Sequence, residues 1–395
     1  MHWIPRIVAS LLLTFGGAIV HAGEPVVIGQ TEHLHSAVLD EARTYHVALP
    51  ASYKWAKDRR YPVLYVLDGA WHFQHAAASV GYLAAHGEIP EMIVVAIDST
   101  KRVRDFTQSD WPAGWIGGGG AANFKRFLST ELMPAVDRAY RTDGFRVLSG
   151  HSASAQFALY CLTAEPALFQ GYIALSPSLD WDDRLPQRSL EASFAVASGV
   201  GELRAFLYVA RSDDLGQALA DYERLVETLE KRAPRGFRFK SQAFPDETHV
   251  SLPLLAQIDG LRHLYSGYRL HDDQLEKGFA FAQAHFERVS KTVGWTLPVP
   301  EEVVNNFAYA ALEQGRVEEA LALFRRNVDA NPGSANAWDG LADGYAKAGN
   351  GQEAAAAAAR AEQLAAEQDH PNRAYFAQQA RKMAERLRQE AEKPH

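Results

Sequence analysis

Short apolar runs alternate with amphipathic helical segments between residues 43 and 249, and this alternation constrains the fold more than any other feature of the chain. A helical segment over 123–136 carries apolar residues at helical spacing, so one face of it would pack on a sheet. Four of the runs are almost continuously apolar, as expected for strands covered on both faces: Tyr61–Leu67, Met92–Ile97, Gly171–Leu175 and Ala205–Ala210. The pattern predicts an α/β fold with a mostly parallel central sheet flanked by helices.

Length and charge limit the organisation and the partners of the chain. A single core rarely grows beyond roughly 300 residues, so 395 residues predict one large folded part and a smaller companion. The net charge is −8 and no block of five or more Lys or Arg occurs, so we expect no nucleic-acid partner. The single cysteine, Cys161, excludes an internal disulfide and a thiolate zinc site.

The first 22 residues have the pattern of a cleaved signal peptide. Arg6 precedes an apolar run from Ile7 to Val20, and Ala22 offers a small residue at the cleavage position. The run is shorter than the ~20 residues that span a bilayer, although a retained membrane anchor is the alternative. We therefore expect a periplasmic or secreted protein without a membrane span.

The composition changes beyond Gly294, where Ala, Glu, Gln and Arg dominate and the β-branched runs end. The pattern around Gly315 returns around Gly349, a spacing of 34 residues, which resembles tetratricopeptide helix pairs. We expect a connector over 269–300 and helical repeats over 301–395, with a capping helix over 372–390. A generic helical tail is the alternative, and a protein or peptide is a candidate partner for the repeats.

A candidate nucleophile lies in the sequence Gly150-His-Ser-Ala-Ser154. The strand Phe145–Ser149 runs into this turn, and a helical pattern follows it, so Ser152 would lie at a strand–turn–helix elbow with an accessible hydroxyl. Ser154 occupies the position at which the G-x-S-x-G pattern has its second glycine. The alternative is an ordinary serine at a helix N-terminus.

A base and an acid follow Ser152 in the order that this arrangement requires. His249 ends a loop after the strand Phe237–Ala243, and it would accept the hydroxyl proton of Ser152. Asp213 and Asp214 follow the strand Ala205–Ala210; we favour Asp213, which is one residue closer to the strand, and Asp214 remains the alternative.

Further candidates surround this trio. Backbone amides after the strand Val63–Leu67 and after the nucleophile would form an oxyanion hole, and Ala70 and Ala153 supply them. We expect Trp71 and His151 to line the substrate pocket. The pairs His72/His75 and His33/His35 lack a third ligand at a recognisable spacing, so no metal is expected.

Several blocks in this order resemble the enterochelin-esterase-like esterases, a branch of the α/β-hydrolases. The blocks lie at 36–45, 61–69, 104–107, 150–152, 176–179, 248–251 and 259–261. The resemblance implies an α/β-hydrolase esterase domain over 23–268, a serine nucleophile at Ser152, a general base at His249 and no cofactor. Arg104 belongs to one of these blocks, and we expect it to contact the substrate.

Together these features predict a serine carboxylic-ester hydrolase that acts on a small-molecule ester through an acyl-serine intermediate. Two alternatives remain open. In the first, the acyl-enzyme would pass its acyl group to an alcohol instead of to water. In the second, the hydrolase part would be catalytically vestigial and would serve as a protein-binding module. The natural ester stays open among a siderophore lactone, a feruloyl ester and a simple acyl ester.

Overall fold

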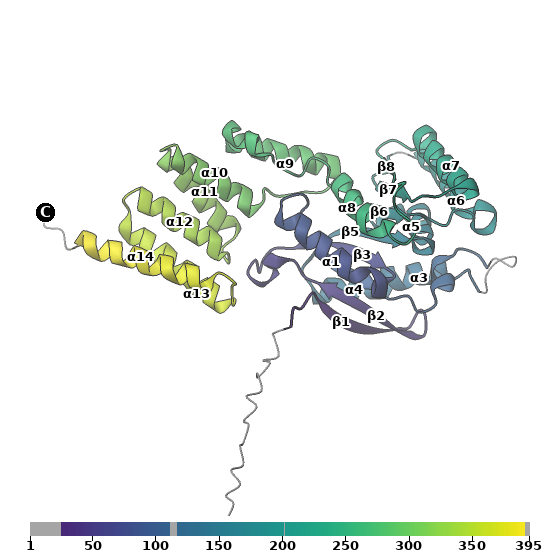
Figure 1. Ribbon diagram of the computed structural model, residues 1–395, viewed down its shortest axis with the longest axis horizontal. Helices are drawn as coiled ribbons and strands as arrows, with labels where there is room; N and C mark the ends of the chain where they lie inside the picture. Colours follow the sequence, from purple (N-terminus) through teal and green to yellow (C-terminus); the bar gives the residue numbers. More distant parts are fainter. Residues whose placement is uncertain (1–24, 111–116, 201, 392–395) are drawn as a thin grey trace, which may run out of the picture.

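The computed structural model of the protein describes residues 25–110, 117–200 and 202–391. The predicted signal peptide, residues 1–22, lies outside the described residues. Figure 1 shows two parts, a sheet flanked by helices and a helical extension that reaches away from it.

The first part is built on an eight-stranded sheet with the order β1-β2-β4-β3-β5-β6-β7-β8. Five successive pairs, from β4/β3 to β7/β8, are parallel, and β1/β2 and β2/β4 are antiparallel. The strands are β1 Gln30–Ser36, β2 Glu41–Ala48, β3 Tyr61–Leu67, β4 Ile93–Ile97, β5 Thr142–His151, β6 Gly171–Leu175, β7 Phe206–Arg211 and β8 Arg238–Ala243. The predicted α/β fold with a mostly parallel sheet is confirmed.

Helices cover both faces of this sheet. Side chains alternate along β3, so that Val63 and Tyr65 belong to the core on one face of the sheet, whereas Leu64 and Val66 belong to the core on the other face. The helices of this part are α1 Gly69–Ala85, α2 Arg102–Phe106, α3 Ala121–Phe127, α4 Met133–Ala139, α5 Ala153–Ala164, α6 Trp181–Val200, α7 Gly216–Arg232 and α8 Leu252–Leu264. Because both faces are covered, the strands read as continuous apolar runs.

The helix predicted over 123–136 is interrupted. A π-helical turn, Leu128–Leu132, separates α3 from α4. Pro134 lies at the start of α4, and it has no N–H to donate to the preceding turn. The regular hydrogen-bond pattern therefore cannot run through this position, and the chain makes a wider turn.

The helical extension consists of two helix pairs and a final helix. After α9 Phe279–Val293 the chain forms α10 Glu301–Glu313, α11 Val317–Ala330, α12 Ala335–Lys347, α13 Gly351–Glu367 and α14 Arg373–Ala391. Gly315 and Gly349 lie in the turns between the two helices of each pair, with φ of 75° and 80°. A residue with a side chain would be strained at such a φ, which explains the glycine at both positions.

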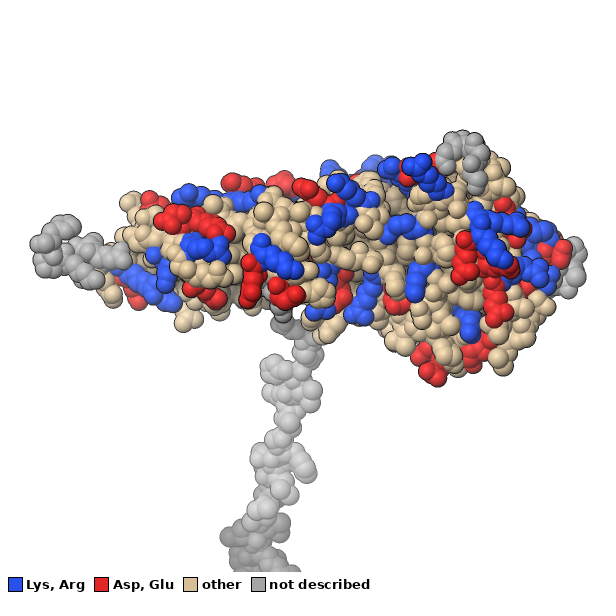
Figure 2. Space-filling model, turned by 90° about the horizontal axis from the view of Figure 1, so that it is seen from above, with Lys and Arg blue, Asp and Glu red and all other residues tan. Residues whose placement is uncertain are grey.

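The two parts contact each other through Trp55. Its ring lies 5.2 Å from that of His370, between α13 and α14, and its carbonyl oxygen lies against Gly333, between α11 and α12. The connector packs on the sheet part, where Trp295 Nε1 donates a hydrogen bond to Asp143 (3.2 Å). Basic and acidic side chains are mixed over both parts on the face shown in Figure 2.

Candidate active site

Ser152 lies in a sharp turn between β5 and α5. Its φ and ψ are 61° and −119°, a conformation that costs a residue with a side chain of order 1–3 kcal/mol. The turn is held by a hydrogen bond from the Ser152 N–H to the carbonyl oxygen of Leu175 (2.9 Å). A Cβ atom on Gly150 would overlap the carbonyl oxygen of Ser154, so only glycine fits there. The structure thus places Ser152 at the predicted elbow.

Ser154 stands where the motif has glycine, and its buried hydroxyl has three hydrogen-bond partners, of which the carbonyl oxygen of His151 (2.9 Å) is one. It donates to Asp68 Oδ2 (2.7 Å) and accepts from the N–H of His151 (2.8 Å). A glycine would make none of these bonds. The serine therefore connects the elbow to the end of β3.

Asp68 is the centre of this connection. The residue is buried between β3 and α1, and Arg102 donates to both of its carboxylate oxygens, from Nε (2.9 Å) and Nη2 (3.0 Å). The same Nη2 donates to the carbonyl oxygen of His151 (3.0 Å), and Ser99 Oγ donates to Asp68 Oδ1 (2.5 Å). Charge-assisted and bidentate hydrogen bonds of this kind fix geometry strongly. Sequence reasoning missed the roles of Asp68, Ser99 and Arg102.

Ala70 and Ala153 lie in the first turns of α1 and α5. Amide groups in a first helical turn have no acceptor within the helix, so both can point to an external oxygen. The N–H groups of Trp71 and His72 donate to the Asp68 carbonyl oxygen (2.9 and 3.2 Å), which begins α1 directly after β3. Because β3 and β5 are neighbouring parallel strands, the two helices start at the same edge of the sheet.

His249 lies in the loop between β8 and α8, and it is exposed. It lines a cavity of about 230 Å³ together with Asp214 and Ser176. Asp214 Oδ2 accepts hydrogen bonds from Ser176 Oγ (3.2 Å) and from the N–H of Ser212 (3.2 Å). The structure therefore brings Asp214 and His249 to one cavity.

Asp213 has different surroundings. Its side chain is exposed, it does not line the cavity of His249, and its backbone N–H donates to the carbonyl oxygen of Glu247 (2.9 Å). The carboxylates of Asp213 and Asp214 therefore lie in different environments, although the two residues are neighbours in the sequence. Asp213 was favoured because it is closer to the strand end, but closeness along the chain does not determine the direction in which a side chain points.

A row of imidazoles extends from His249 into the protein. The ring of His151 lies 4.5 Å from that of His249 and 5.8 Å from that of His72, and His72 Nδ1 lies 3.0 Å from His75 Nε2. Burial lowers the pKa of His151 to about 3, with the neighbouring His249 as a further cause. Burial also lowers the pKa of His72, and together with His72 it lowers the pKa of His75 to about 4. These three imidazoles are neutral at pH 7.

Of the three residues predicted to contact the substrate, two lie near the elbow and one is bound to carboxylates. Trp71 is 71% exposed at the start of α1, with the Arg102 guanidinium 5.8 Å from its ring centroid. His151 is buried beside His249. Arg104 instead donates to Glu41 (2.6 Å) and Asp105 (2.7 Å), so that carboxylates occupy its guanidinium. The arginine that contacts the elbow is Arg102.

The described residues contain neither a cluster of metal-ligating side chains nor a helix that could span a membrane. Across residues 25–110, 117–200 and 202–391, no three His, Cys, Asp or Glu side chains are grouped as a metal site would require. Within the same residues, no helix combines the length and the apolar character needed to cross a bilayer.

Comparison with known proteins gives consistent matches. Residues 36–250 match a family described as "Putative esterase". The ferri-bacillibactin esterase BesA of Bacillus subtilis is 31% identical over 247 residues, which are 55% of this chain and 83% of BesA. The IroE-like serine hydrolase of Shewanella oneidensis is 27% identical with a TM-score of 0.65, covering 75% of this chain and 97% of that one.

A third similarity extends further along the chain. An uncharacterised protein of Capnocytophaga ochracea covers 85% of this chain and 93% of its own, with a TM-score of 0.58 and 19% identity. At that identity the likeness concerns the fold alone.

Proposed function

This chain belongs to the esterase family and is a carboxylic ester hydrolase, and we propose that Ser152 carries the acyl group during turnover. The single observation that supports this role best is the elbow, where Ser152 is held at φ 61° between β5 and α5. A strained turn of this kind presents a hydroxyl above the edge of the sheet, with the next backbone amide beside it.

The reaction would proceed in two halves. His249 takes the Ser152 proton as the oxygen attacks the ester carbonyl, and the amides of Ala70 and Ala153 donate to the resulting oxyanion. The C–O bond to the alcohol then breaks, and His249 returns the proton to that alcohol. In the second half His249 deprotonates water, which attacks the acyl-serine and releases the acid and Ser152.

We propose Asp214, rather than Asp213, as the carboxylate that orients His249. Asp214 lines the same cavity as His249, and hydrogen bonds from Ser176 and Ser212 fix its side chain. Such a carboxylate holds the imidazole in the tautomer that accepts the serine proton, and it stabilises the imidazolium that forms.

For the substrate we propose a siderophore ester. The support is the similarity to a ferri-bacillibactin esterase, together with Trp71, whose exposed ring beside the Ala70 amide offers a stacking surface for an aromatic acyl group. A feruloyl ester and simple acyl esters are the competing substrates in the test.

The test compares the mature protein and Ser152→Ala on p-nitrophenyl esters of increasing chain length, a feruloyl ester and a tricatecholate siderophore lactone. We expect turnover by the wild type only, with the highest kcat/KM on the lactone. An alcohol added in competition distinguishes hydrolysis from acyl transfer by its products. An active Ser152→Ala variant would contradict the nucleophile, and a wild type inactive on every ester would favour the vestigial binding module.

We further propose that residues 1–22 are a cleaved export signal and that the extension is tetratricopeptide-like, with a protein or peptide as partner. The 34-residue spacing of Gly315 and Gly349, each between the helices of a pair, supports the repeat. The N-terminal sequence of the protein recovered from the periplasm or the medium tests the export. A start near residue 23 is expected, whereas an intact Met1 would contradict cleavage.

A further inference from the structure

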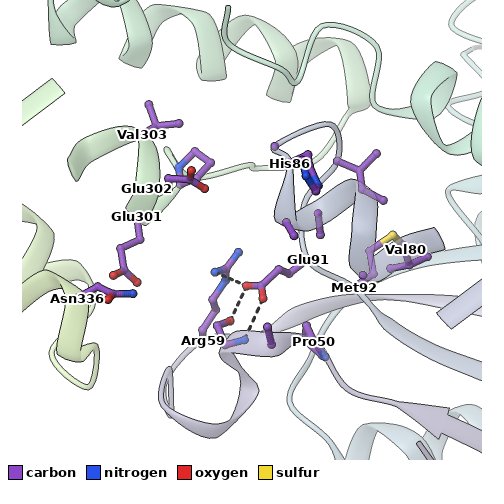
Figure 3. A pocket seen from close by; sticks show the side chains of 18 of the residues that line it. Pro50, Arg59, Val80, His86, Glu91, Met92, Glu301, Glu302, Val303 and Asn336 are labelled. Atoms are coloured by element: carbon purple, nitrogen blue, oxygen red, sulfur yellow. Dashed lines mark hydrogen bonds and ion pairs between the residues drawn. The ribbon is translucent and has the colours of Figure 1, made fainter. Parts of the chain in front are cut away.

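A cavity lies at the junction of the two parts, and the proposed catalytic residues do not line it. Its volume is about 710 Å³, which is within the range of small-molecule sites. The loop after β2, the C-terminal half of α1, the connector and helices α10, α12 and α14 all contribute to its walls. Figure 3 shows this junction cavity.

Both arginines that line the junction cavity are already paired with carboxylates. Arg59 Nη1 donates to Glu91 (2.8 Å), which also accepts hydrogen bonds from the N–H and the Oγ of Ser52 (2.9 and 2.5 Å). Arg269 donates to Glu88 (2.7 Å). Each guanidinium is therefore bound to a carboxylate; the charge of Arg59 also favours the ionised form of Glu301, although the two side chains form no ion pair in the described residues.

Three more carboxylates line the cavity from the helical extension: Glu301, Glu302 and Asp339. In the part of the chain that the structure describes, none of them forms an ion pair. Glu301 accepts a hydrogen bond from Ser334 Oγ (2.5 Å), and Asp339, which is 8% exposed, accepts one from the Tyr375 hydroxyl (3.2 Å). Carboxylates removed from water without a cation are costly.

The pKa values of two of these carboxylates reflect that cost. Burial raises the pKa of Glu301. Burial and the neighbouring Asp343 raise the pKa of Asp339 to about 6. A cation placed between the two groups would favour their ionised forms and would gain from both.

The opposite side of the cavity carries apolar side chains beside the Arg59–Glu91 ion pair. Val80 and Ala84 of α1 and Met92 before β4 line it from the sheet part, with Leu270 and Phe286 from the connector. In Figure 3 the labelled Glu301, Glu302 and Asn336 lie on one side, and Val80 and Met92 lie on the other. A ligand that spans the cavity therefore meets negative charge at one end and hydrocarbon at the other.

We propose that the junction cavity binds an organic cation, in which an ammonium or guanidinium group is carried on an aliphatic body. The charged group would lie between Glu301 and Asp339, and the aliphatic body would lie against the partly exposed apolar side chains Ala84 of α1 and Leu270 of the connector. Charge complementarity and the two unlike walls support this ligand. The site is separate from the ester-cleaving site, so it stands whether or not Ser152 has the role proposed above.

The test is calorimetric titration of the mature full-length protein at pH 7.5 and low salt with hexylamine, with 1-hexanol as the neutral analogue. We expect hexylamine to bind at one site and at least about tenfold more tightly than hexanol, a difference of ~1.4 kcal/mol. Added salt should weaken the binding of the amine. The peptide acetyl-Ala-Lys-Ala-amide is titrated alongside, and tighter binding of the peptide than of hexylamine would identify a lysine side chain as the source of the cation.

Two variants locate the site. Asp339→Asn and Glu301→Gln should each weaken hexylamine binding at least about fivefold, with circular dichroism showing that both are folded. Asp369→Asn is the matched control, because Asp369 is exposed and pairs with Arg373 outside the cavity, and it should bind as the wild type does. Equal affinity for amine and alcohol, no binding of the amine at about 1 mM, or unchanged binding by both cavity variants would overturn the proposal.

Discussion

Asp68 links the two turns that supply the proposed oxyanion amides. It follows β3, directly before the helix that carries Ala70, and it accepts hydrogen bonds from Ser154 of the elbow and from Arg102. The positions of the Ala70 and Ala153 amides therefore depend on one buried carboxylate. We regard Asp68 as a positioning residue, because it acts on the site through its neighbours.

Asp68→Asn should lower both stability and turnover. Breaking a buried ion pair typically costs about 3–5 kcal/mol of the free energy of unfolding, because Arg102 is left without its partner. The loss of alignment should reduce kcat by about tenfold or more and leave KM nearly unchanged. Denaturant unfolding and steady-state kinetics measure the two effects. Ser99→Ala, which removes only one hydrogen bond to Asp68, is the milder control, and a change in KM alone for Asp68→Asn would contradict the positioning role.

Asp214→Asn and Asp213→Asn form a matched pair, because the two residues are neighbours and both changes remove a charge while keeping the shape. Asp214→Asn should lower kcat/KM by about 10³- to 10⁴-fold, since His249 loses the carboxylate that sets its tautomer. Asp213→Asn should stay within about twofold of the wild type. Initial rates on one p-nitrophenyl ester decide between them, and the reverse order of effects would identify Asp213 as the orienting acid.

The sequence predicts the elbow at Ser152 well, but it does not predict the residues that hold the elbow in place. Ser152 directly follows a strand and His249 lies in the loop after another strand, and local patterns reveal both positions. Ser154 and Asp68 are 86 positions apart, and only the packing of β3 beside β5 brings them together. No local signal connects them, and none indicates that Arg102 contacts the elbow.

The turn between β5 and α5 depends most on Gly150. Gly150→Ala places a methyl group against the carbonyl of Ser154, so the turn must open. We expect kcat to fall by about 100-fold or more and the melting temperature to decrease. Gly81→Ala in α1 is the control, because a methyl group there meets no atom within 4 Å and alanine favours the helix by about 0.5–1 kcal/mol. A Gly150→Ala variant with wild-type activity would show that the elbow does not depend on this glycine.

Strands and helices can be predicted from the sequence where a single pattern of apolar residues determines them. The bounds of β3 and β6 agree with the predicted runs 61–67 and 171–175, because strands covered on both faces are continuously apolar. The antiparallel pair β1 and β2 carries mostly partly exposed or polar residues, and no run of apolar residues marks β1. The break at Pro134 also escaped prediction, because the apolar spacing continues through it.

The buried imidazole of His151 and the partly buried imidazoles of His72 and His75 link the stability of the whole protein to pH. Histidine in an unfolded chain has a pKa near 6.5, and the pKa values of His72, His75 and His151 are lower in the folded protein. The unfolded state therefore binds more protons below about pH 6.5, and stability decreases as the pH falls towards 4. A loss of about 2 kcal/mol or more between pH 7 and 5 is expected from denaturant unfolding. His75→Gln should make the decrease shallower, and an identical pH profile would contradict this origin.

The contact between Trp55 and Gly333 should couple the unfolding of the two parts. Gly333→Ala would place a methyl group on the carbonyl oxygen of Trp55, so the helical extension must move away from the sheet part. We expect calorimetric unfolding to become broader or to split into two transitions, while activity on small esters changes by less than about twofold. Gly81→Ala again serves as the control. A single, unshifted transition for Gly333→Ala would show that the two parts are not held together at this point.

The sequence indicates that there are two parts, because the composition changes beyond Gly294. It does not indicate how they meet. Trp55 and His370 are separated by most of the chain, and the junction cavity combines a helix of the sheet part with three helices of the extension. The pairing of surfaces depends on shape, which local periodicity does not contain.

The open ends of the sheet have a consequence for association between molecules. In the described residues, no further strand pairs with the outer side of β1 or of β8. Exposed strand edges are templates for intermolecular pairing and aggregation, and charged side chains oppose it. Glu32 lies within β1, and Arg238 and Lys240 lie within β8. Pairing of two β1 edges, or of two β8 edges, would place like charges side by side, so these residues oppose association of copies through identical edges.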